Sequence, residues 1–406
     1  MTKNKLKMFL EENNGILRLT PTWVPRAFCR PGKRIKLHPD DYYALGAARG
    51  GIDERWFAST THAENGPETP ADEGLSYIAL NEDASEKILL KDAVELLGAE
   101  LIGEYLWEKY HGWAMFSKYF DNLGPLPHHI HHRDAHAARV GCKGKPEMYF
   151  FPSQVNNHPG EFGYTFLGLT PDTTKEQVKE ALENFTKGDN RLLDLSQAYI
   201  LTPDTGFDVP PGLRHAPGSM CTYEPQFASD VYAMYQSVLY GGHTVSEDLL
   251  WKNCPDEERG NVDYLLDVID WELNTDPDLY KNRFMKPILA GDVDAMAKDG
   301  YLDEWICYKC PVVSAKRLTV YPGAKVTIRD GAAYGFIAVQ GSGIINGQKI
   351  ETPTLIRYGE ATRDEFFVAD YAAKEGVVIG NTSTCEPLVL LKHFSENPEC
   401  PAVKKS

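Results

Sequence analysis

Residues 126–151, LPHHIHHRDAHAARVGCKGKPEMYFF, place five histidines, two lysines and a glutamate between two apolar ends. In an extended strand alternate side chains share a face, so His129 and His131 point the same way while Ile130 faces the opposite layer. Two imidazoles on one face are suited to hold a metal ion. The stretch therefore predicts a β-strand that carries part of a metal site.

Two further ligand candidates follow along the chain. After a polar connection with two glycines, an apolar strand begins at Glu147. The Pro/Gly-rich turn VPPGLRHAPG, residues 209–218, delivers His215 to the start of another apolar strand. Three histidines and one carboxylate predict a mononuclear site with open positions, suited to zinc, iron(II), manganese or nickel.

A plainer interpretation exists for these histidines. A His-x-His pair by itself is more often part of a polar surface strand, and His215 by itself would be a turn residue. The later glutamate and the histidine in the Pro-Gly turn together reverse that preference and favour the metal site.

Composition narrows the classes of function. The chain has 406 residues and a formal net charge of −16 at pH 7, so its general field would repel nucleic acid and anionic membranes. The start, MTKNKLKMFLEE, lacks the apolar core of a signal peptide, and no stretch is apolar enough to span a membrane. With eight scattered cysteines interpreted as reduced thiols, the expected location is the cytoplasm.

Apolar periodicity divides the chain into three ranges. Residues 1–235 are expected to form a metal-binding lobe of strands, with an amphipathic helix over 93–106 and a capped helix over 173–185. Residues 236–306, rich in Asp, Glu and Tyr, are expected to be a helical insertion. Residues 307–406 return to short strands broken by Pro-Gly, Asp-Gly and Asn-Gly turns, which predicts a second β-sandwich lobe.

The second lobe is expected to bind no metal. Its hairpin over 341–347 is of the kind that closes a metal-binding sandwich, but no His-x-His pair precedes it. Where ligands would lie, the chain offers Ile328, Asp330 and Tyr334.

Several motifs occur together and resemble those of one family. Lys-Pro-Glu at 145–147 follows the histidine run, Pro-Pro-Gly-Leu-Arg-His ends at His215, and Glu-Pro-Gln at 224–226 precedes Ser229-Asp230. In this order they resemble the type I mannose-6-phosphate isomerases, zinc-dependent bicupins that interconvert aldoses and ketoses. The resemblance covers most of the chain outside the helical insertion.

The resemblance implies a fold, a cofactor and a partner. The fold is expected to be mainly β, with two cupin lobes of the jelly-roll β-sandwich type and helical insertions. One divalent metal ion is expected on His129, His131, Glu147 and His215, zinc first, with manganese and iron as alternatives. The partner is expected to be a small sugar or sugar phosphate, and the oligomeric state is left open, with a homodimer as one option.

Four more residues are candidates for the chemistry. Lys145 lies two residues before Glu147, which puts both side chains on one strand face, so its ammonium could hold a substrate oxygen or move a proton. Glu224 could serve in proton transfer or orient a ligand. Trp56 and Ser59 could line a sugar pocket by stacking and hydrogen bonding, although a tryptophan in a strand is more often core.

Two departures from the family pattern affect the choice of metal and substrate. The family has a glutamine where this chain has His129, so the ligand set is that of the general three-His, one-Glu cupin. Bacterial members place an arginine shortly after the Ser-Asp pair, where this chain has Tyr-Ala-Met-Tyr over 232–235. A guanidinium there could stabilise an enediolate, and one such contact is worth roughly 3 kcal/mol. Either another residue compensates or the chemistry differs.

The sequence thus predicts a metal-dependent aldose-ketose isomerase that moves a proton between adjacent sugar carbons through a cis-enediol. Two alternatives stay open. One is an iron cupin dioxygenase, because three histidines and a glutamate also hold iron(II). The other is a non-catalytic sugar-binding bicupin that lost catalysis together with the arginine.

Overall fold

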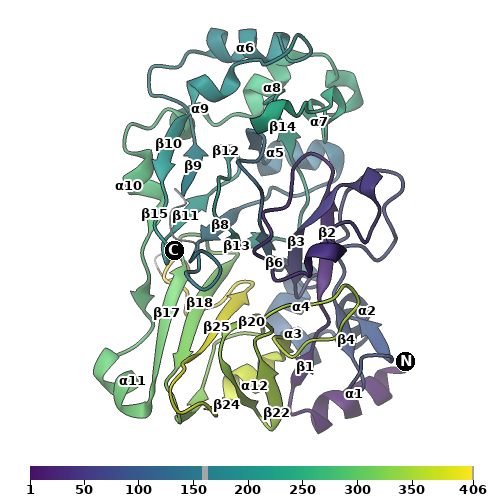
Figure 1. The fold of residues 1–406 in the computed structure, drawn as a ribbon, viewed down its shortest axis with the longest axis vertical. Helices are drawn as coiled ribbons and strands as arrows, with labels where there is room; N and C mark the ends of the chain where they lie inside the picture. Colours follow the sequence, from purple (N-terminus) through teal and green to yellow (C-terminus); the bar gives the residue numbers. More distant parts are fainter. Residues whose placement is uncertain (158–162, 405–406) are drawn as a thin grey trace.

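Two β-sandwich lobes follow one another along the long axis of the molecule (Figure 1). The structure, a computed structural model, describes residues 1–157 and 163–404. Within these residues, the upper lobe pairs a seven-stranded antiparallel sheet with a five-stranded antiparallel sheet. In sheet order the seven strands are β15 (Phe284–Met285), β11 (Gly206–Val209), β8 (Glu147–Phe150), β13 (Thr222–Phe227), β6 (Met115–Phe120), β3 (Gly51–Phe57) and β2 (Thr22–Arg26). The five are β10 (Gln197–Ile200), β9 (Tyr164–Leu167), β12 (Arg214–Ala216), β7 (His129–Ile130) and β14 (Ala233–Met234).

The lower lobe is a second sandwich, built in the described part of the chain from a seven-stranded and a four-stranded sheet. The larger sheet has the order β1 (Ile16–Arg18), β23 (Glu365–Val368), β20 (Tyr334–Gln340), β25 (Leu388–Phe394), β18 (Ser314–Val320), β17 (Tyr301–Cys307) and β16 (Ile288–Leu289). The smaller sheet has the order β19 (Lys325–Ile328), β24 (Val377–Asn381), β21 (Ser342–Ile345) and β22 (Gln348–Glu351), and a separate ribbon joins β4 (Tyr77–Ala79) to β5 (Lys87–Leu89). The predicted fold class, mainly β with two jelly-roll lobes and helical insertions, is confirmed.

The N-terminal strand belongs to the sheet of the lower lobe. β1 pairs antiparallel with β23, with Ile16 opposite Val368 and Arg18 opposite Phe366. The division of the chain into three ranges stays a prediction, but this pairing joins residues from the first and last of those ranges in one sheet.

The lobes meet through an extensive apolar core. Phe57 and Tyr223 from the large sheet of the upper lobe belong to the same buried cluster as Ile337 and Leu391 from the large sheet of the lower lobe. Burial of apolar surface on this scale stabilises the contact between the two sandwiches.

The helix predicted over 93–106 is interrupted twice. It forms α2 (Leu90–Leu97), α3 (Ala99–Ile102) and α4 (Glu104–Tyr110), with Gly98 and Gly103 between them at φ 53° and 85°. Glycine adopts positive φ without the steric cost that other residues meet, so both positions end a helix and turn the chain.

The helix predicted over 173–185 is confirmed as α6 (Lys175–Glu183). Thr174 accepts a hydrogen bond from the backbone N–H of Gln177, whose side chain accepts one from the backbone N–H of Thr174, forming a capping box. The apolar segment 231–240 contains β14, which pairs with β7.

Short helices cover one end of the upper lobe (Figure 1). α6 packs with α8 (Val262–Val268) over the five-stranded sheet, and Ile130 from that sheet joins Val178 and Leu265 in one buried cluster. The remaining helices are α1 (Lys3–Glu12), α5 (Asp134–Ala137), α7 (Glu247–Leu250), α9 (Trp271–Asn274), α10 (Leu279–Arg283), α11 (Val293–Asp299) and α12 (Asp370–Glu375).

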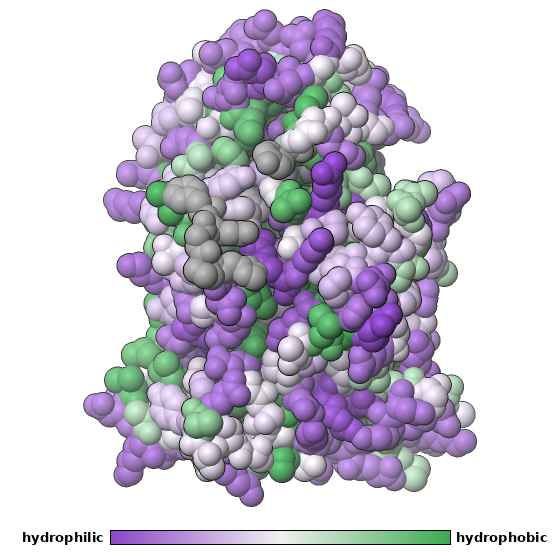
Figure 2. Space-filling model, viewed as in Figure 1, coloured by the Kyte–Doolittle hydropathy of each residue, from purple (hydrophilic) through white to green (hydrophobic). Residues whose placement is uncertain are grey.

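The visible surface is mostly hydrophilic, with apolar residues scattered among polar ones (Figure 2). Among the described residues, no helix has the length and apolarity that a membrane crossing requires.

Candidate metal centre

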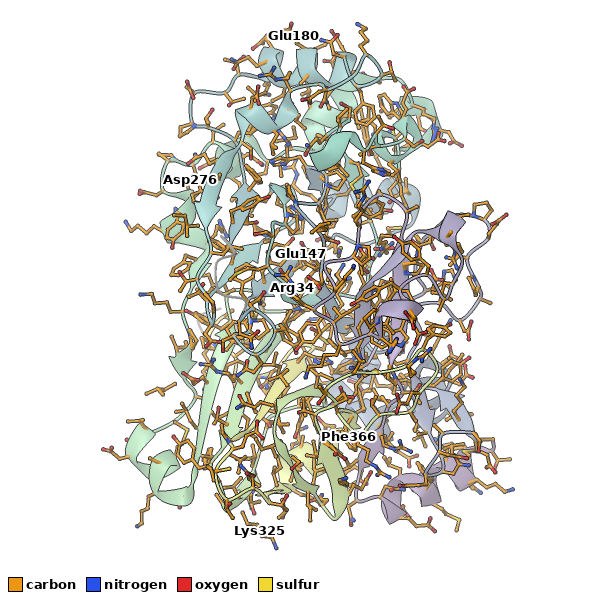
Figure 3. All side chains as sticks on the ribbon, viewed as in Figure 1. Arg34, Glu147, Glu180, Asp276, Lys325 and Phe366 are labelled. Atoms are coloured by element: carbon orange, nitrogen blue, oxygen red, sulfur yellow. The ribbon has the colours of Figure 1, made fainter. Side chains whose placement is uncertain are left out.

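The four ligand candidates come from two facing sheets. β7 of the five-stranded sheet holds His129, and His131 follows it directly. His215 on the neighbouring strand β12 pairs with His129 across the ladder. Glu147 is the first residue of β8 in the seven-stranded sheet, and it lies near the middle of the molecule (Figure 3). The polar positions of both sheets therefore meet inside the upper lobe.

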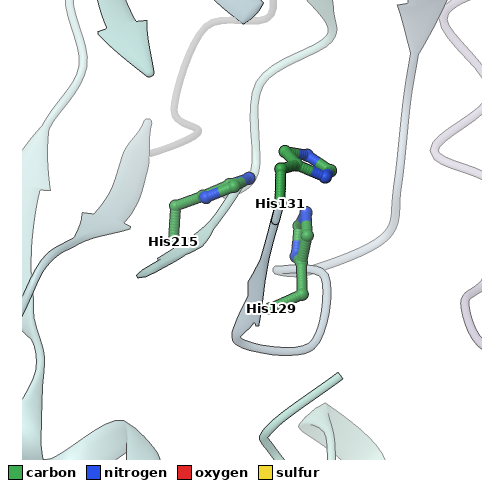
Figure 4. Close-up of side chains that lie close together, drawn as sticks. All are labelled: His129, His131 and His215. Atoms are coloured by element: carbon green, nitrogen blue, oxygen red, sulfur yellow. The ribbon is translucent and has the colours of Figure 1, made fainter. Parts of the chain in front are cut away.

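The three imidazoles lie against one another (Figure 4). The ring centroids of His129 and His215 are 4.1 Å apart. The ring centroid of His131 lies 5.2 Å from that of His129 and 5.1 Å from that of His215. One nitrogen from each ring lies within 4.8 Å of one nitrogen from each of the others. All three side chains are buried, which is the arrangement of a shared ligand site.

A backbone carbonyl orients each ring by accepting a hydrogen bond from Nδ1, while Nε2 faces the cluster. Nδ1 of His129 donates to the carbonyl oxygen of Pro127 at 2.8 Å, and Nδ1 of His131 donates to that of Val231 at 2.8 Å. Nδ1 of His215 donates in the same way to a backbone carbonyl at 2.9 Å. Because the proton is held on Nδ1, each Nε2 presents a lone pair.

Burial favours the neutral form of His129 and His131. It lowers the pKa of His129 well below the usual value, with a further contribution from the neighbouring His215. Burial likewise lowers the pKa of His131 to about 4. Neutral imidazoles are the form that binds a metal ion.

Glu147 lies beside the three imidazoles. Its Oε1 lies 3.1 Å from Nε2 of His215, and its Oε2 lies 3.0 Å from Nε2 of His131. The hydroxyl of Tyr149 donates to Oε1 at 2.6 Å. Burial opposes ionisation, but His131 and Lys145 hold the pKa of Glu147 well below its usual value. The carboxylate is therefore charged.

This donor set fits a divalent metal ion. Nε2 of His215 is buried without a hydrogen-bond partner. Imidazole lone pairs and carboxylate oxygens all accept, so their close approach is favourable only around a cation. The structure supports a divalent metal site, although the donor types do not by themselves select zinc.

The two candidate catalytic residues lie beside the cluster. Nζ of Lys145 is 3.0 Å from Oε2 of Glu147 and 3.4 Å from Nε2 of His131. Glu224 on β13 lies 3.7 Å from the same ammonium. Burial, followed by the charge of Glu147, raises the pKa of Glu224 to about 8. Both side chains face the cluster, as strand alternation predicted for Lys145.

A buried chain of charges continues from there, and the sequence analysis missed it. Nζ of Lys118 lies 3.4 Å from Glu224 and 3.5 Å from Glu54. Glu54 in turn accepts from Nε and Nη2 of Arg26 at 3.2 and 3.3 Å. The available signal was the apolar strand FSKYF, in which alternation places Lys118 on the same face as two phenylalanines.

Trp56 and Ser59, the candidates for a sugar pocket, lie in the core of the upper lobe. Trp56 is fully buried, stacks on Phe116 with ring centroids 4.4 Å apart, and donates its indole N–H to Glu54 at 2.6 Å. Ser59 is also fully buried, and its hydroxyl donates to the carbonyl oxygen of Thr61 at 3.2 Å. Both side chains are engaged by core neighbours, and a role toward a sugar stays a prediction.

The segment after Ser229-Asp230 contributes an apolar side chain beside the cluster. Met234 on β14 pairs with His129 across the ladder and is buried. A guanidinium does lie close to this segment, but it comes from β2, because Nη2 of Arg26 is 3.8 Å from Asp230.

The lower lobe has a buried ion network around Asp330, one of the positions named in the sequence analysis. Asp330 accepts from Nζ of Lys316 at 2.8 Å and from Nζ of Lys392 at 3.0 Å. Asp303 lies 3.3 Å from Lys316 and 3.4 Å from Lys392. Asp330 is thus neutralised by two ammonium groups, while Tyr334 is packed in the apolar core. That this lobe binds no metal stays a prediction.

Solved structures match the chain in fold. No model of a known protein family matches it, and no curated protein matches it in sequence. A mannose 6-phosphate isomerase from Bacillus subtilis matches with a TM-score of 0.58 at 15% identity, over 94% of this chain and 99% of its own. A mutant phosphomannose isomerase from Salmonella typhimurium matches with a TM-score of 0.61 at 12% identity, over 94% of this chain and 100% of its own. A zinc-bound mannose 6-phosphate isomerase matches with a TM-score of 0.59 at 13% identity, over 94% of this chain and 100% of its own. The resemblance seen in the sequence is confirmed at the level of fold.

Proposed function

We propose that this protein is a metal-dependent aldose-ketose isomerase that acts on a sugar or sugar phosphate through a cis-enediol. The observation that carries the proposal is the juxtaposition of three imidazoles and a carboxylate with a buried ammonium, that of Lys145, 3.0 Å from the carboxylate. The solved structures of the same fold include a zinc-bound mannose 6-phosphate isomerase.

We assign the metal to His129, His131, Glu147 and His215. Zinc is the metal we expect, with manganese and iron as alternatives. When bound, the ion supplies Lewis-acid stabilisation of negative charge on the substrate oxygens.

The chain's own residues supply the remaining parts of the reaction. Lys145 offers N–H donors beside the ligand set and holds a substrate oxygen as charge develops on it. Glu224, whose pKa burial raises to about 8, exchanges the proton: its carboxylate form takes a proton from one sugar carbon and its protonated form returns it to the next. Lys118 and Arg26 hold Glu224 and Glu54 in position through their ion pairs.

Arg26 could take the place of the arginine that bacterial members of the family have after the Ser-Asp pair and that this chain lacks there. Its guanidinium reaches Asp230 from β2, while the segment that follows Asp230 presents Met234. We infer that the positive charge near the reacting oxygens comes from Lys145, Lys118 and Arg26 together.

Two measurements test the proposal. Metal analysis of protein purified without added metal should find one zinc or manganese ion per chain. Incubation with a panel of aldoses, ketoses and their phosphates in deuterium oxide should place solvent deuterium on the carbon next to the carbonyl of one of them. Stoichiometric iron with oxygen uptake would favour the dioxygenase alternative, and binding of a sugar without exchange would favour the sugar-binding alternative.

A further inference from the structure

Arg214 lies next to His215 on β12 but faces the other way. It pairs with Ile130 of β7, whose side chain lies in the apolar cluster beneath α6 and α8. Cross-strand partners share a face of the sheet, so Arg214 extends into this layer and away from the histidine cluster. Its relative exposure is 0%.

The guanidinium has no acceptor in the described residues. Nε, Nη1 and Nη2 are all buried without a hydrogen-bond partner, and no ion pair joins them to a carboxylate. Other buried cations of the described chain have partners: Arg18, Arg26, Arg55, Lys118, Lys145, Lys316 and Lys392. A buried charge without a counter-charge costs several kcal/mol, so this position calls for an explanation.

The neighbouring polar groups do not supply a negative charge. His128 lies close enough for Arg214 to add to the lowering of its pKa by burial, and its buried Nδ1 has no hydrogen-bond partner, but a neutral imidazole does not compensate a guanidinium. The ring of Tyr235 lies 6.0 Å from the guanidinium carbon, and its hydroxyl donates to the carbonyl oxygen of Leu265 at 2.7 Å. The hydroxyl of Ser196 donates to the carbonyl oxygen of Gly168 at 2.7 Å and also contacts Nε2 of His128 at 2.6 Å. Tyr235 and Ser196 are therefore already committed to other partners.

We propose that Arg214 is the anchor of an internal binding site for one small monovalent anion of the chloride class. The guanidinium offers five N–H donors and a full positive charge in an apolar layer, and a monovalent anion would satisfy both. A water molecule would accept hydrogen bonds but would leave the charge uncompensated. The site lies on the opposite face of β12 from the metal cluster, so it is separate from the proposed reaction.

The first test measures how chloride changes the Tm of the protein. At equal ionic strength, replacing gluconate by chloride should raise the Tm of the wild type by roughly 2–5 °C, because the anion binds only the folded chain. Arg214→Met should abolish this difference, and in gluconate its Tm should equal or exceed that of the wild type, since no charge is buried. Lys179→Met removes an exposed cation of α6 that pairs with Asp263, and this control should keep the chloride effect.

The second test locates the anion in the unaltered protein. A crystal grown with bromide should show one anomalous peak at hydrogen-bond distance from the Arg214 guanidinium. Three results would each overturn the proposal. They are equal Tm values of the wild type in the two salts, the same chloride effect in Arg214→Met, and a water molecule at this position in the bromide crystal. Neither readout uses catalysis, so the result is independent of the isomerase assay.

Discussion

At the scale of single residues, the histidine cluster is set up by contacts on the far side of each ring. The carbonyl oxygens of Pro127, Val231 and Leu213 hold the Nδ1 protons of the three rings, and two of these carbonyls lie two residues before the histidine they orient. Such contacts fix both the tautomer and the ring orientation before a metal arrives, which lowers the cost of binding.

Removing one ligand should remove the metal. In His131→Ala or His215→Ala the affinity for zinc should fall by more than about a hundredfold, because loss of a supporting hydrogen bond alone costs up to that much. The metal content of each variant after dialysis checks the loss of affinity. A circular dichroism spectrum of the same sample checks that the variant is folded. His243→Ala, at an exposed position, should keep its metal. Full metal content in both ligand variants would contradict the assignment.

Lys145 should matter for turnover and not for metal binding. Lys145→Met keeps the length of the side chain and removes the ammonium beside Glu147, so we expect the loss of roughly 3 kcal/mol of transition-state stabilisation, about a hundredfold in rate. The rate at which solvent deuterium enters the sugar measures this loss of turnover.

Lys143→Met is the matched control. This exposed lysine lies two residues earlier, with its Nζ 5.2 Å from the ring centroid of Tyr110. It should exchange deuterium at the wild-type rate, and an equal rate in Lys145→Met would remove Lys145 from the chemistry.

At the scale of elements, glycines decide where the helical region after β5 turns. Apolar periodicity runs through 93–106 without a break, and this is why the sequence predicted one helix. The backbone breaks because Gly98 adopts φ 53° with ψ −123°, and its N–H closes α2 on the carbonyl oxygen of Val94. Periodicity reports which side chains are buried, and it does not report where the chain bends.

Gly98→Ala should therefore destabilise the fold. An added Cβ would lie 2.9 Å from Cε2 of Trp107, and the backbone conformation is one that other residues rarely adopt. We expect the free energy of unfolding in urea to fall by about 1–3 kcal/mol. Gly112→Ala has open space and no positive φ, so it should change stability by less than about 1 kcal/mol. Similar losses in both variants would refute this account.

At the scale of the whole molecule, a buried ion cluster joins the lobes. Arg55 of β3 donates to Asp364 at 2.8 and 2.9 Å and to Glu365 at 3.3 Å, beyond the apolar core that both lobes share. Glu365 also accepts from the backbone N–H of Ala58 at 3.1 Å. The contact therefore couples the metal-bearing sandwich to the lower one.

Glu365 should make stability depend on pH. Burial raises its pKa to about 8 despite the opposing charge of Arg55. A raised pKa in the folded state means that the folded chain binds the proton more tightly, so its contribution is complete below about pH 4.5 and is lost as pH rises toward 8.

Glu365→Gln isolates this contribution. Between pH 5 and 8 the free energy of unfolding of the wild type should fall relative to Glu365→Gln by up to a few kcal/mol. Urea unfolding at the two pH values measures this, with the exposed Glu375→Gln as a control that should follow the wild type. A difference between wild type and Glu365→Gln that does not change with pH would contradict the prediction.

The sequence by itself determined the parts that depend on local pattern. Strand alternation placed His129 and His131 on one face, a Pro-Gly turn brought in His215, and Lys145 followed from its spacing to Glu147. Turn residues and short alternating runs likewise predicted the two sandwiches, and an N-cap threonine followed by a helical pattern predicted α6. These properties are set by neighbours within a few residues.

Only the tertiary structure decided which distant groups meet. Lys118, Glu54 and Arg26 come from three strands, and their alignment into one chain of charges depends on the register of β2, β3 and β6. Trp56 was assigned to a pocket because its residue type suits stacking, yet packing placed it against Phe116. Arg214 shares a motif with His215, and only the sheet shows that it lies in an apolar layer without a counter-charge. Burial and long-range pairing arise from the packing of whole elements, which no local pattern encodes.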